Sequence, residues 1–536
     1  MHFNGSLSSL TTFRLALLSV GCLPLIAEGG ELTFNKSVGS SASIYQTSRD
    51  SGETDGYAVT VKPKLVSIYS SNRAYGAFTV DHSQIQQGGD LGSSYQNYTN
   101  YSLNSVTNLI ENVLRLSFNA QQRYRAANQS DNLVSDQLLF QDNLGKTTNY
   151  TASLDFTSPN PTYVGWNWQA LYGKTTADKT TSATNRLDST NKSVSLNLFD
   201  GKELNRVDFS LSGQFANTTR ANSQDFKTTL LNGNVRFGLI GDISFMVLGS
   251  DSEYQINDEV VSNNQRYINS SSYGAGLRWS PSDVRYIEVT YNNLEQDNLI
   301  TKYVGLNANW AFTQRTNLGL SYGKRFYGDT YSADFSYNLK SFRTALSYSE
   351  SVTSFSRLSY SIESVGLFVC PVGSAEFAEC FQVEDLSYVL QPGEEFRSLN
   401  DLSTDVTDEV ILNKVGQLSF GYDKRKLKVS VNLRSSEIEY LESQRVQNID
   451  SIGLNLAYQL SKRIGLALVT TLSTRETNLN DTRGNDDTLS MTASMNRKLS
   501  KNATLNTSFR YVDRDSDNNA RDVTDKRITV GLNYTF

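Results

Sequence analysis

The residue types that carry out most enzyme chemistry are scarce in this chain. Its 536 residues include 2 histidines, His2 and His82, and 3 cysteines. No Ser-His-Asp or Cys-His arrangement, GxSxG turn or zinc-ligand spacing can be assembled from them. We therefore expect no catalytic residue, no metal site and no cofactor.

The basic residues form a more informative pattern. Polar and basic residues alternate with apolar ones in stretches such as LRLSFNA (114–120), LKVSVNL (427–433) and LNTSFRY (505–511). A period of two places successive side chains on opposite faces of a β-strand. If the apolar face meets lipid, the polar face lines a lumen. The basic residues predicted to line it are Arg115, Arg123, Arg236, Arg278, Arg325, Arg343, Lys428, Arg434 and Arg510.

Such a lumen predicts a preference among solutes. The acidic residues of the same set are Asp208, Glu288 and Asp334, and most remaining positions are Ser, Thr, Asn, Gln or Gly. Because rings of Arg and Lys favour anions, we expect a hydrated pore that accepts anionic or hydroxyl-rich solutes. The alternative is that polar residues simply fill the wall and the arginines pair with acidic loops.

The elements that would position these residues repeat along the chain. An alternating stretch of about ten residues followed by a turn recurs from residue 31 to 536. Tight connections are expected at 158–161, 238–242, 280–283, 313–315, 339–341, 423–426, 460–463 and 498–502, and longer polar ones at 125–147, 175–191, 258–270, 474–486 and 514–526. Outer-membrane barrels sort short turns and long loops by side in this way. The sequence predicts an all-β, transmembrane antiparallel barrel of about 24 strands, within a range of about 18 to 26.

The predicted location follows from this fold. An even strand number places both termini on one side, which we expect to be the periplasm of a Gram-negative bacterium. Hydrophobic residues make up 38% of the chain and the mean hydropathy is -0.41, as expected when only the outward half of each strand meets lipid. The net charge of -6 argues against a nucleic-acid partner. An exported β protein with chance alternation is the alternative.

The chain ends RITVGLNYTF (527–536), an alternating strand with one apolar face. We expect this strand to pair with the first one, which closes the barrel and removes the sheet edge. A terminal aromatic residue with a second aromatic two residues earlier is typical of barrels recognised by the bacterial insertion machinery. Tyr534 and Phe536 are therefore the predicted insertion signal, and outer-membrane lipid and that machinery are predicted partners.

The N-terminal residues 1–29 are predicted to be an export signal. Arg14 precedes the apolar run 15–27, and a small-residue pattern follows it. Lipidation at Cys22 is the alternative. Residues 30–536 would then form the single barrel.

The two remaining cysteines, Cys370 and Cys380, form an even pair in an exported chain, which predicts a disulfide. Both lie in the longest connection, 356–409, which is predicted to be an extracellular loop. Its acidic end could fold into the basic lumen, or the loop could be a surface excursion. The acidic residues concerned are Asp401, Asp405, Asp408 and Glu409.

Residues 315–357 carry a family resemblance. An Arg315-Thr316 turn is followed by the motif YGKRFYG (322–328), a short basic turn at 340–343 and Tyr348-Ser349. This segment resembles the outer-membrane β-barrel family associated with the PEP-CTERM and exopolysaccharide systems of Gram-negative bacteria. The turn WSPS (279–282) also resembles that family, whereas 101–125 fits its N-terminal part more loosely.

The resemblance implies a role in exporting exopolysaccharide, with a polysaccharide substrate and periplasmic export proteins as partners. It supplies no catalytic residue. Among the inward arginines, Arg325 is the first candidate for contacting the polymer, because it lies in the shared motif and on the polar face. The alternatives are a general or substrate-specific uptake porin and a non-conducting surface or adhesive barrel.

Overall fold

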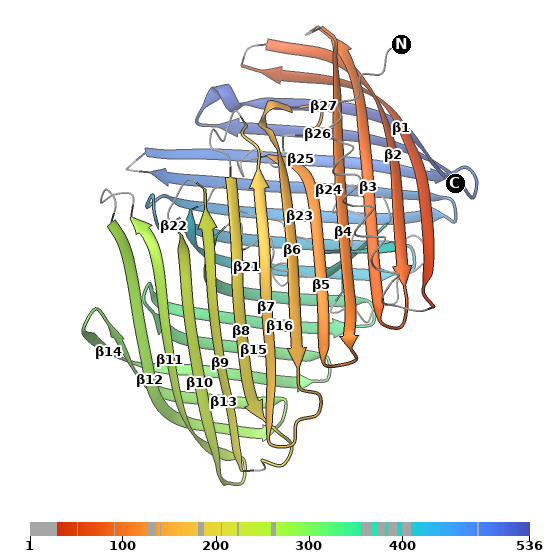
Figure 1. Ribbon diagram of the computed structural model, residues 1–536. Coiled ribbons are helices and arrows are strands. Elements are labelled where there is room, and N and C mark those ends of the chain that lie inside the picture. The colour runs from red at the N-terminus through yellow and green to blue at the C-terminus, as the bar shows by residue number, and fades with distance from the viewer. Residues whose placement is uncertain are drawn as a thin grey trace.

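Backbone pairing joins the alternating segments into one wall that closes on itself. In the computed structural model, 24 antiparallel strands form a single sheet, and the last strand pairs with both the strand before it and the first strand of the chain. In Figure 1 the orange and yellow strands of one side cross the green, cyan and blue strands of the other. The structure describes residues 29–536 except 51, 91, 127–133, 135, 140, 181–186, 205, 222–224, 259–263, 355–356, 358–366, 372–380, 384–393, 399–408 and 480–481. The predicted export signal lies outside these residues, apart from Gly29.

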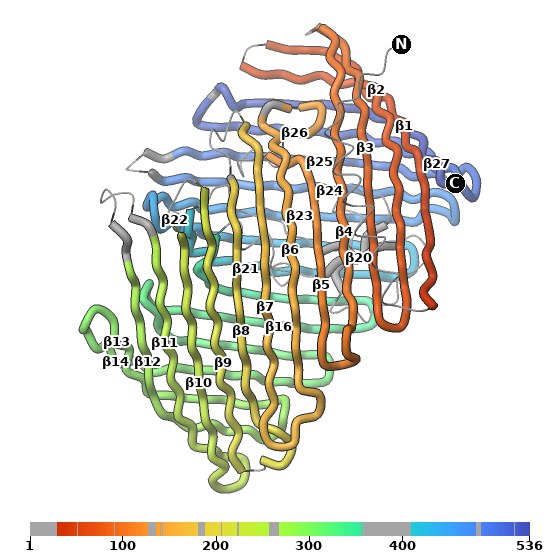
Figure 2. Tube along the Cα trace, viewed as in Figure 1, coloured from red at the N-terminus to blue at the C-terminus, as the bar shows by residue number. Residues whose placement is uncertain are grey.

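The first half of the wall follows chain order without crossovers, as the tube in Figure 2 shows. Its strands are β1 (Glu31–Arg49), β2 (Gly52–Ser70), β3 (Ala74–Gly89), β4 (Ser94–Ile110), β5 (Leu114–Ala126), β6 (Leu144–Thr157), β7 (Val164–Ala177), β8 (Leu187–Asp200), β9 (Val207–Arg220), β10 (Phe226–Ile240), β11 (Ile243–Asp258) and β12 (Asn264–Ser282). A 3₁₀ turn, η3 (Gln141–Asn143), precedes β6.

The second half continues in the same order. Its strands are β13 (Arg285–Gln296), β14 (Leu299–Thr313), β15 (Thr316–Arg325), β16 (Gly328–Leu339), β17 (Phe342–Ser354), β21 (Val410–Lys424), β22 (Leu427–Tyr440), β23 (Val446–Ser461), β24 (Ile464–Leu479), β25 (Thr482–Lys498), β26 (Ala503–Ser516) and β27 (Val523–Thr535). A small separate sheet of β18 (Leu367–Pro371), β19 (Phe381–Val383) and β20 (Glu394–Ser398) lies within the 355–409 connection, and η5 (Asn519–Arg521) precedes β27. No helix among the described residues is long and apolar enough to span a membrane.

The two ends of the barrel differ. The end at which β1 begins and β27 finishes, here called the terminal end, carries short turns such as 241–242, 314–315 and 462–463, where tight connections were predicted. At the opposite, distal end the connections at 127–143 and 178–186 lie within two of the expected long loops, but strand replaces most of two others: β12 begins at Asn264, and β24 runs to Leu479. The sequence-based prediction was wrong for β24 because both faces of its end, from Thr474 to Asn478, are polar. The alternation that marks a strand disappears, although backbone groups still gain from cross-strand pairing.

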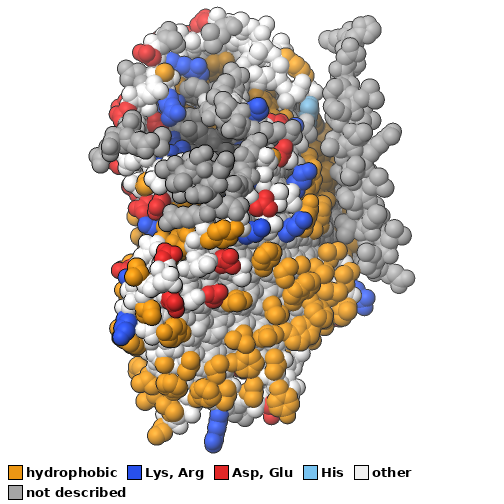
Figure 3. Space-filling view, turned by 60° about the vertical axis from the view of Figure 1, so that its left-hand side comes forward, with side chains coloured by type: hydrophobic (Ala, Val, Ile, Leu, Met, Phe, Trp, Pro, Cys, Tyr) orange, Lys and Arg blue, Asp and Glu red, His pale blue; other side chains and the backbone are white. Residues whose placement is uncertain are grey.

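The outward face carries a continuous apolar belt. On β24 it comprises Ile464, Leu466, Leu468 and Leu472, after which the outward positions become polar, starting with Thr474. That stretch of about nine residues is the length a tilted strand needs to cross the hydrocarbon layer. Figure 3 shows hydrophobic side chains gathered on one half of the visible wall and charged ones on the other half. A closed barrel with such a belt is an outer-membrane protein.

Closure at the C-terminus is as predicted. β27 pairs with β1 from Val523 to Thr535, and the Phe536 N–H donates to the Lys36 carbonyl at 2.9 Å. The rings of Tyr534 and Phe536 meet edge to face with centroids 5.0 Å apart, and Phe536 is 71% exposed. The final aromatic pair therefore lies on the outward face at the rim of the belt.

Candidate functional site

The register of the ladders assigns every strand an inner and an outer face. Residues paired across neighbouring strands share a face, and the exposed leucines of the belt mark the outer one. All nine predicted lumen cations belong to the other series. Their cross-strand partners are Asp155 for Arg115, Thr147 for Arg123, Asp208 for Arg236, Glu288 for Arg278, Gly328 for Arg325, Asn338 for Arg343, Asp423 for Lys428, Gln417 for Arg434 and Arg527 for Arg510. Their role in conduction remains a prediction.

Two of the nine meet at one carboxylate near the terminal end. Arg278 Nη1 lies 2.7 Å from Glu288 Oε1, and Arg236 Nη1 lies 3.8 Å from the same oxygen. Arg236 also lies 3.7 Å from Asp208, and Asn307 donates to the second Glu288 oxygen at 2.7 Å. This cluster fixes both guanidinium groups on the inner wall of β10–β13.

The remaining predicted cations do not form one ring with that cluster. Lys428 lies 3.6 Å from Asp423 in an exposed pair, while Arg343 pairs in register with Asn338 on the neighbouring strand. Arg434 lies midway along β22, and Arg325 ends β15. The inner wall thus presents basic groups at several heights.

Arg510 is held by a segment that lies against the inner wall of the barrel. In the β5–β6 connection, of which 134, 136–139 and 141–143 are described, Asp136 lies at the inner wall of β26 and β27, with its Oδ2 2.5 Å from Arg510 Nη1 and 2.7 Å from Arg527 Nη1. β5 and β27 are five places apart around the wall. The carboxylate is therefore a tether that holds this connection inside the barrel.

Asp136 also organises its own segment. Its Oδ1 accepts the backbone N–H groups of Leu138 and Leu139 at 2.8 and 2.7 Å, so one carboxylate folds the turn and docks it. Burial by itself would raise the pKa of Asp136, but Arg527 and Arg510 outweigh burial and hold the pKa below its ordinary value of 3.8. The tether is consequently charged at neutral pH.

Apolar contacts support the docked segment. Val134 and Leu139, 0% and 4% exposed, pack with Val512 of β26 and Val523 of β27. Leu138 packs on the separate cluster of Ala58, Ile85 and Tyr98 on the inner face of β2–β4. The described residues 134 and 136–139 therefore lie along the inner wall from β4 to β26 and narrow the lumen there.

The distal mouth is narrowed by a second arrangement. β16 stops pairing with β17 at Tyr348, but β17 continues to Ser354 paired with β21 alone. By alternation, Val352 and Val410 lie on the outer face of these two strands. They nevertheless pack against Phe226, Tyr254, Ile256 and Ile268, which lie on the inner face of β10–β12. The distal ends of β17 and β21 therefore lie inside β10–β12, as in a scroll.

Two arginines fasten this overlap. Arg357, just after β17, donates to the Thr218 and Thr228 hydroxyls at 2.9 Å each and lies 4.0 Å from the Phe226 ring centroid. Burial lowers the pKa of Arg357 to about 9. Arg220 at the end of β9 lies 2.8 Å from Glu442 in the β22–β23 connection, and both side chains are 1% exposed. These contacts hold the distal ends of β17 and β21 against β9–β12, so packed strands occupy one side of the distal mouth.

The motif behind the family resemblance builds part of this overlap. Gly328 has a φ of 118°, which favours glycine at the β15–β16 turn. Phe326 packs against the buried cluster, with its ring 5.1 Å from that of Tyr254. No described ion pair holds Arg325, the first candidate for polymer contact. Gly328 and Phe326 of the motif thus have structural roles in the short β15–β16 hairpin and its packing.

Several central residues were not predicted from sequence. Asp136 gave no signal, since an isolated aspartate in a polar connection is ordinarily solvated. Arg527 and Asp525 do follow the period-two series of the last strand and could have been added to the lumen set. For 356–409 the sequence left inward folding and a surface excursion open, and most of that connection lies outside the described residues, whereas Val134, Asp136 and Leu139 of the β5–β6 connection lie against the inner wall. Cys380 and the acidic residues 401–408 lie outside the described part of the chain, so the disulfide is a prediction.

Among the described residues, no group of three or more His, Cys, Asp or Glu side chains is placed to hold a metal ion. The charged groups at the docked segment are instead the Asp136–Arg510–Arg527 tether and a second carboxylate, Asp525. Asp525 lies 3.2 Å from Arg527 and 3.6 Å from Arg510 and is fully buried.

Comparison with known proteins leaves the family open. No protein-family model and no curated protein sequence matches the chain. Among solved structures, the FrpB iron transporter of Neisseria meningitidis (F3-3 variant) aligns over 93% of this chain and 81% of its own, with a TM-score of 0.40 and 10% identity. The siderophore receptor PirA of Acinetobacter baumannii aligns over 93% of this chain and 80% of its own, with a TM-score of 0.41 and 8% identity. OmpT, an outer-membrane protein of Vibrio cholerae, aligns over 95% of this chain and 100% of its own, with a TM-score of 0.31 and 10% identity. At these values the likenesses assign no substrate.

Proposed function

We propose that this protein is a selective passage for anionic or hydroxyl-rich solutes across the outer membrane. The observation that carries the proposal is the β5–β6 segment, which Asp136 docks on Arg510 and Arg527 inside a closed barrel. A barrel that served only as a surface anchor would not need a charged constriction fixed within its lumen. A constriction set beside inward arginines selects by size and charge at one place.

The chemistry of the wall fits such solutes. The guanidinium groups of Arg236 and Arg278 stand near one end of the lumen, and Arg510 and Arg527 stand beside the constriction. Guanidinium donors bind carboxylate, phosphate and sugar oxygens, and their charge attracts anions. The inner faces between them carry mainly serine, threonine and asparagine, as on β25 and β26.

Two directions of transport are open to this passage. Uptake of small solutes is favoured by the narrowed lumen, because a docked segment and an overlapped mouth restrict the cross-section. Export of exopolysaccharide is supported by the resemblance of residues 315–357, with Arg325 as a polymer contact. Periplasmic export proteins would then be its partners.

Planar-bilayer recording tests the common proposal. The purified barrel is expected to conduct with an anion preference, and an anionic oligosaccharide is expected to block the current. Absence of conductance, or strong cation selectivity, would overturn the proposal. Deleting the gene separates the two directions: reduced extracellular polysaccharide supports export, whereas normal polysaccharide with reduced solute permeability supports uptake.

A further inference from the structure

The outer wall of β6–β10 carries a row of lysines at the distal edge of the apolar belt. On β7 and β8, Lys174 and Lys192 are the first outward positions past the last apolar ones. On β6 and β10, Lys146 and Lys227 are the second, after a threonine. We call these four residues the lysine row.

The register brings the row together. Lys192 of β8 and Lys227 of β10 both pair with Asn217 of β9, so two strand spacings, about 10 Å, separate them. Lys174 pairs with Tyr150, and Lys192 pairs with Tyr172. A single headgroup with two phosphates could therefore contact three of these side chains.

Three members of the row are available for a ligand. Lys174, Lys192 and Lys227 are exposed and form no ion pair with any residue that the structure describes. Lys146 lies 3.3 Å from Asp178, at the edge of the row.

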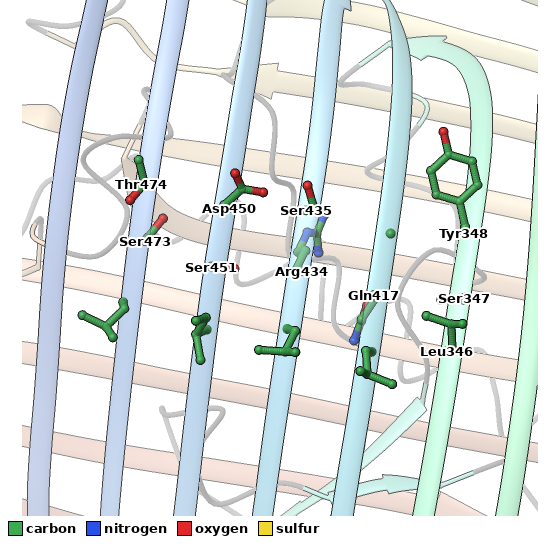
Figure 4. Close-up of a pocket in the computed structure, with 15 residues that line it drawn as sticks. Leu346, Ser347, Tyr348, Gln417, Arg434, Ser435, Asp450, Ser451, Ser473 and Thr474 are labelled. Atoms are coloured by element: carbon green, nitrogen blue, oxygen red, sulfur yellow. The ribbon is translucent and has the colours of Figure 1, made fainter.

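The same edge of the belt on the opposite wall has the reverse charge. The first charged outward positions past the belt there are Glu437, Asp450, Glu476, Asp487 and Asp513. Figure 4 shows Asp450 on this wall, farther toward the distal end than Leu346, which belongs to the apolar belt. Single outward lysines, Lys302, Lys414 and Lys526, occur elsewhere around the barrel, whereas the β6–β10 wall carries four on strands that lie close together.

A groove for an acyl chain adjoins the lysine row. It has a volume of about 280 Å³, and its lining is almost entirely apolar. The small side chains of Ala152 and Ala170 leave space between Leu154, Val194 and Phe215. Lys192 and Tyr172 line its distal end. An apolar groove that ends at a lysine matches a lipid with an anionic headgroup.

We propose that the β6–β10 wall binds a phosphorylated glycolipid of the outer leaflet. Lys174, Lys192 and Lys227 contact its phosphates, and one acyl chain lies in the groove. The row lies at the distal end, opposite the short turns of the terminal end, and short turns face the periplasm in outer-membrane barrels, so the row is assigned to the outer leaflet. Each lysine near an anionic surface strengthens binding, and three act on one headgroup.

Native mass spectrometry of the detergent-purified barrel with added lipid A tests the proposal. Replacing Lys174, Lys192 and Lys227 together by serine should weaken retention at least about tenfold. The matched control replaces three outward lysines elsewhere, Lys302, Lys414 and Lys526, and should leave retention unchanged. Unchanged retention in the first variant, or an equal loss in the control, would overturn the proposal.

Two further arms separate the lipid's parts. Lipid A from which the phosphates have been removed should bind weakly to the wild-type barrel. Its retention should equal that of intact lipid A on the triple lysine variant. Ala152→Phe fills the groove on the lipid-facing side and should also weaken retention. If phosphatidylglycerol binds as well as lipid A, the site does not recognise the glycolipid and the assignment fails.

Discussion

Replacing Asp136 by Asn should release the β5–β6 segment from the inner wall. The substitution keeps the size of the side chain and one acceptor oxygen but removes the charge that faces Arg510 at 2.5 Å and Arg527 at 2.7 Å. The two arginines would retain Asp525, at 3.6 and 3.2 Å, as their remaining carboxylate. The barrel wall itself loses no ladder hydrogen bond.

The magnitude follows from how exposed the three side chains are. Asp136, Arg510 and Arg527 are 30%, 19% and 9% exposed, between a surface pair and a buried one. Breaking a buried pair costs about 3–5 kcal/mol and a surface pair contributes at most about 1 kcal/mol. We therefore expect docking to weaken by about 2 kcal/mol, which lowers the ratio of docked to undocked segment about 30-fold.

Single-channel recording measures this change directly. Asp136→Asn should raise the conductance or add brief high-conductance openings, because the undocked segment no longer narrows the lumen. The matched control is Asp329→Asn, which removes a carboxylate from an exposed pair 3.9 Å from Lys324 and should change nothing.

The pH dependence gives a second readout. The pKa of Asp136 is lowered in the folded protein, so its contribution is complete above the unfolded value of 3.8 and is lost as the pH falls through the lower folded value. Wild-type conductance should change only below about pH 4, and the variant should lack that step. A correctly folded variant with unchanged conductance at both pH values would refute the tether.

Three other changes probe separate parts of the barrel. Glu442→Gln leaves Arg220 buried without its carboxylate and should destabilise the barrel toward urea by about 3–5 kcal/mol, and replacing both residues by leucine should recover most of that loss. Deleting Phe536 should reduce the amount assembled in the outer membrane but not refolding in detergent, because its ring is 71% exposed; Ile528→Ala on the same face is the control. Glu288→Gln removes the carboxylate shared by two arginines and should increase anion selectivity, and a shift toward cations would contradict the inner-wall placement.

The sequence determined most of the wall. Alternation between apolar and polar residues is a local property of each strand, so the strand number, the inner series that contains Arg236 and the outward Tyr534 and Phe536 could be read directly. Closure followed because an unpaired last strand would leave an edge in the membrane. Where both faces of a strand carry polar residues, as from Thr474 onward on β24, the apolar–polar alternation ends, and the continuation of the strand could not be predicted.

The tertiary structure alone decided what lies inside the barrel. Asp136 meets Arg510 across 374 positions of sequence, and Arg220 meets Glu442 across 222 positions (442 − 220). Neither pair could be recognised from the sequence, because an isolated charged residue has the same sequence context whether water or a distant side chain is its partner. The overlap of β17 and β21 inside β10–β12 likewise depends on unequal strand heights around the wall. Period two fixes which face a side chain takes, but only the closed fold brings opposite walls close enough to meet.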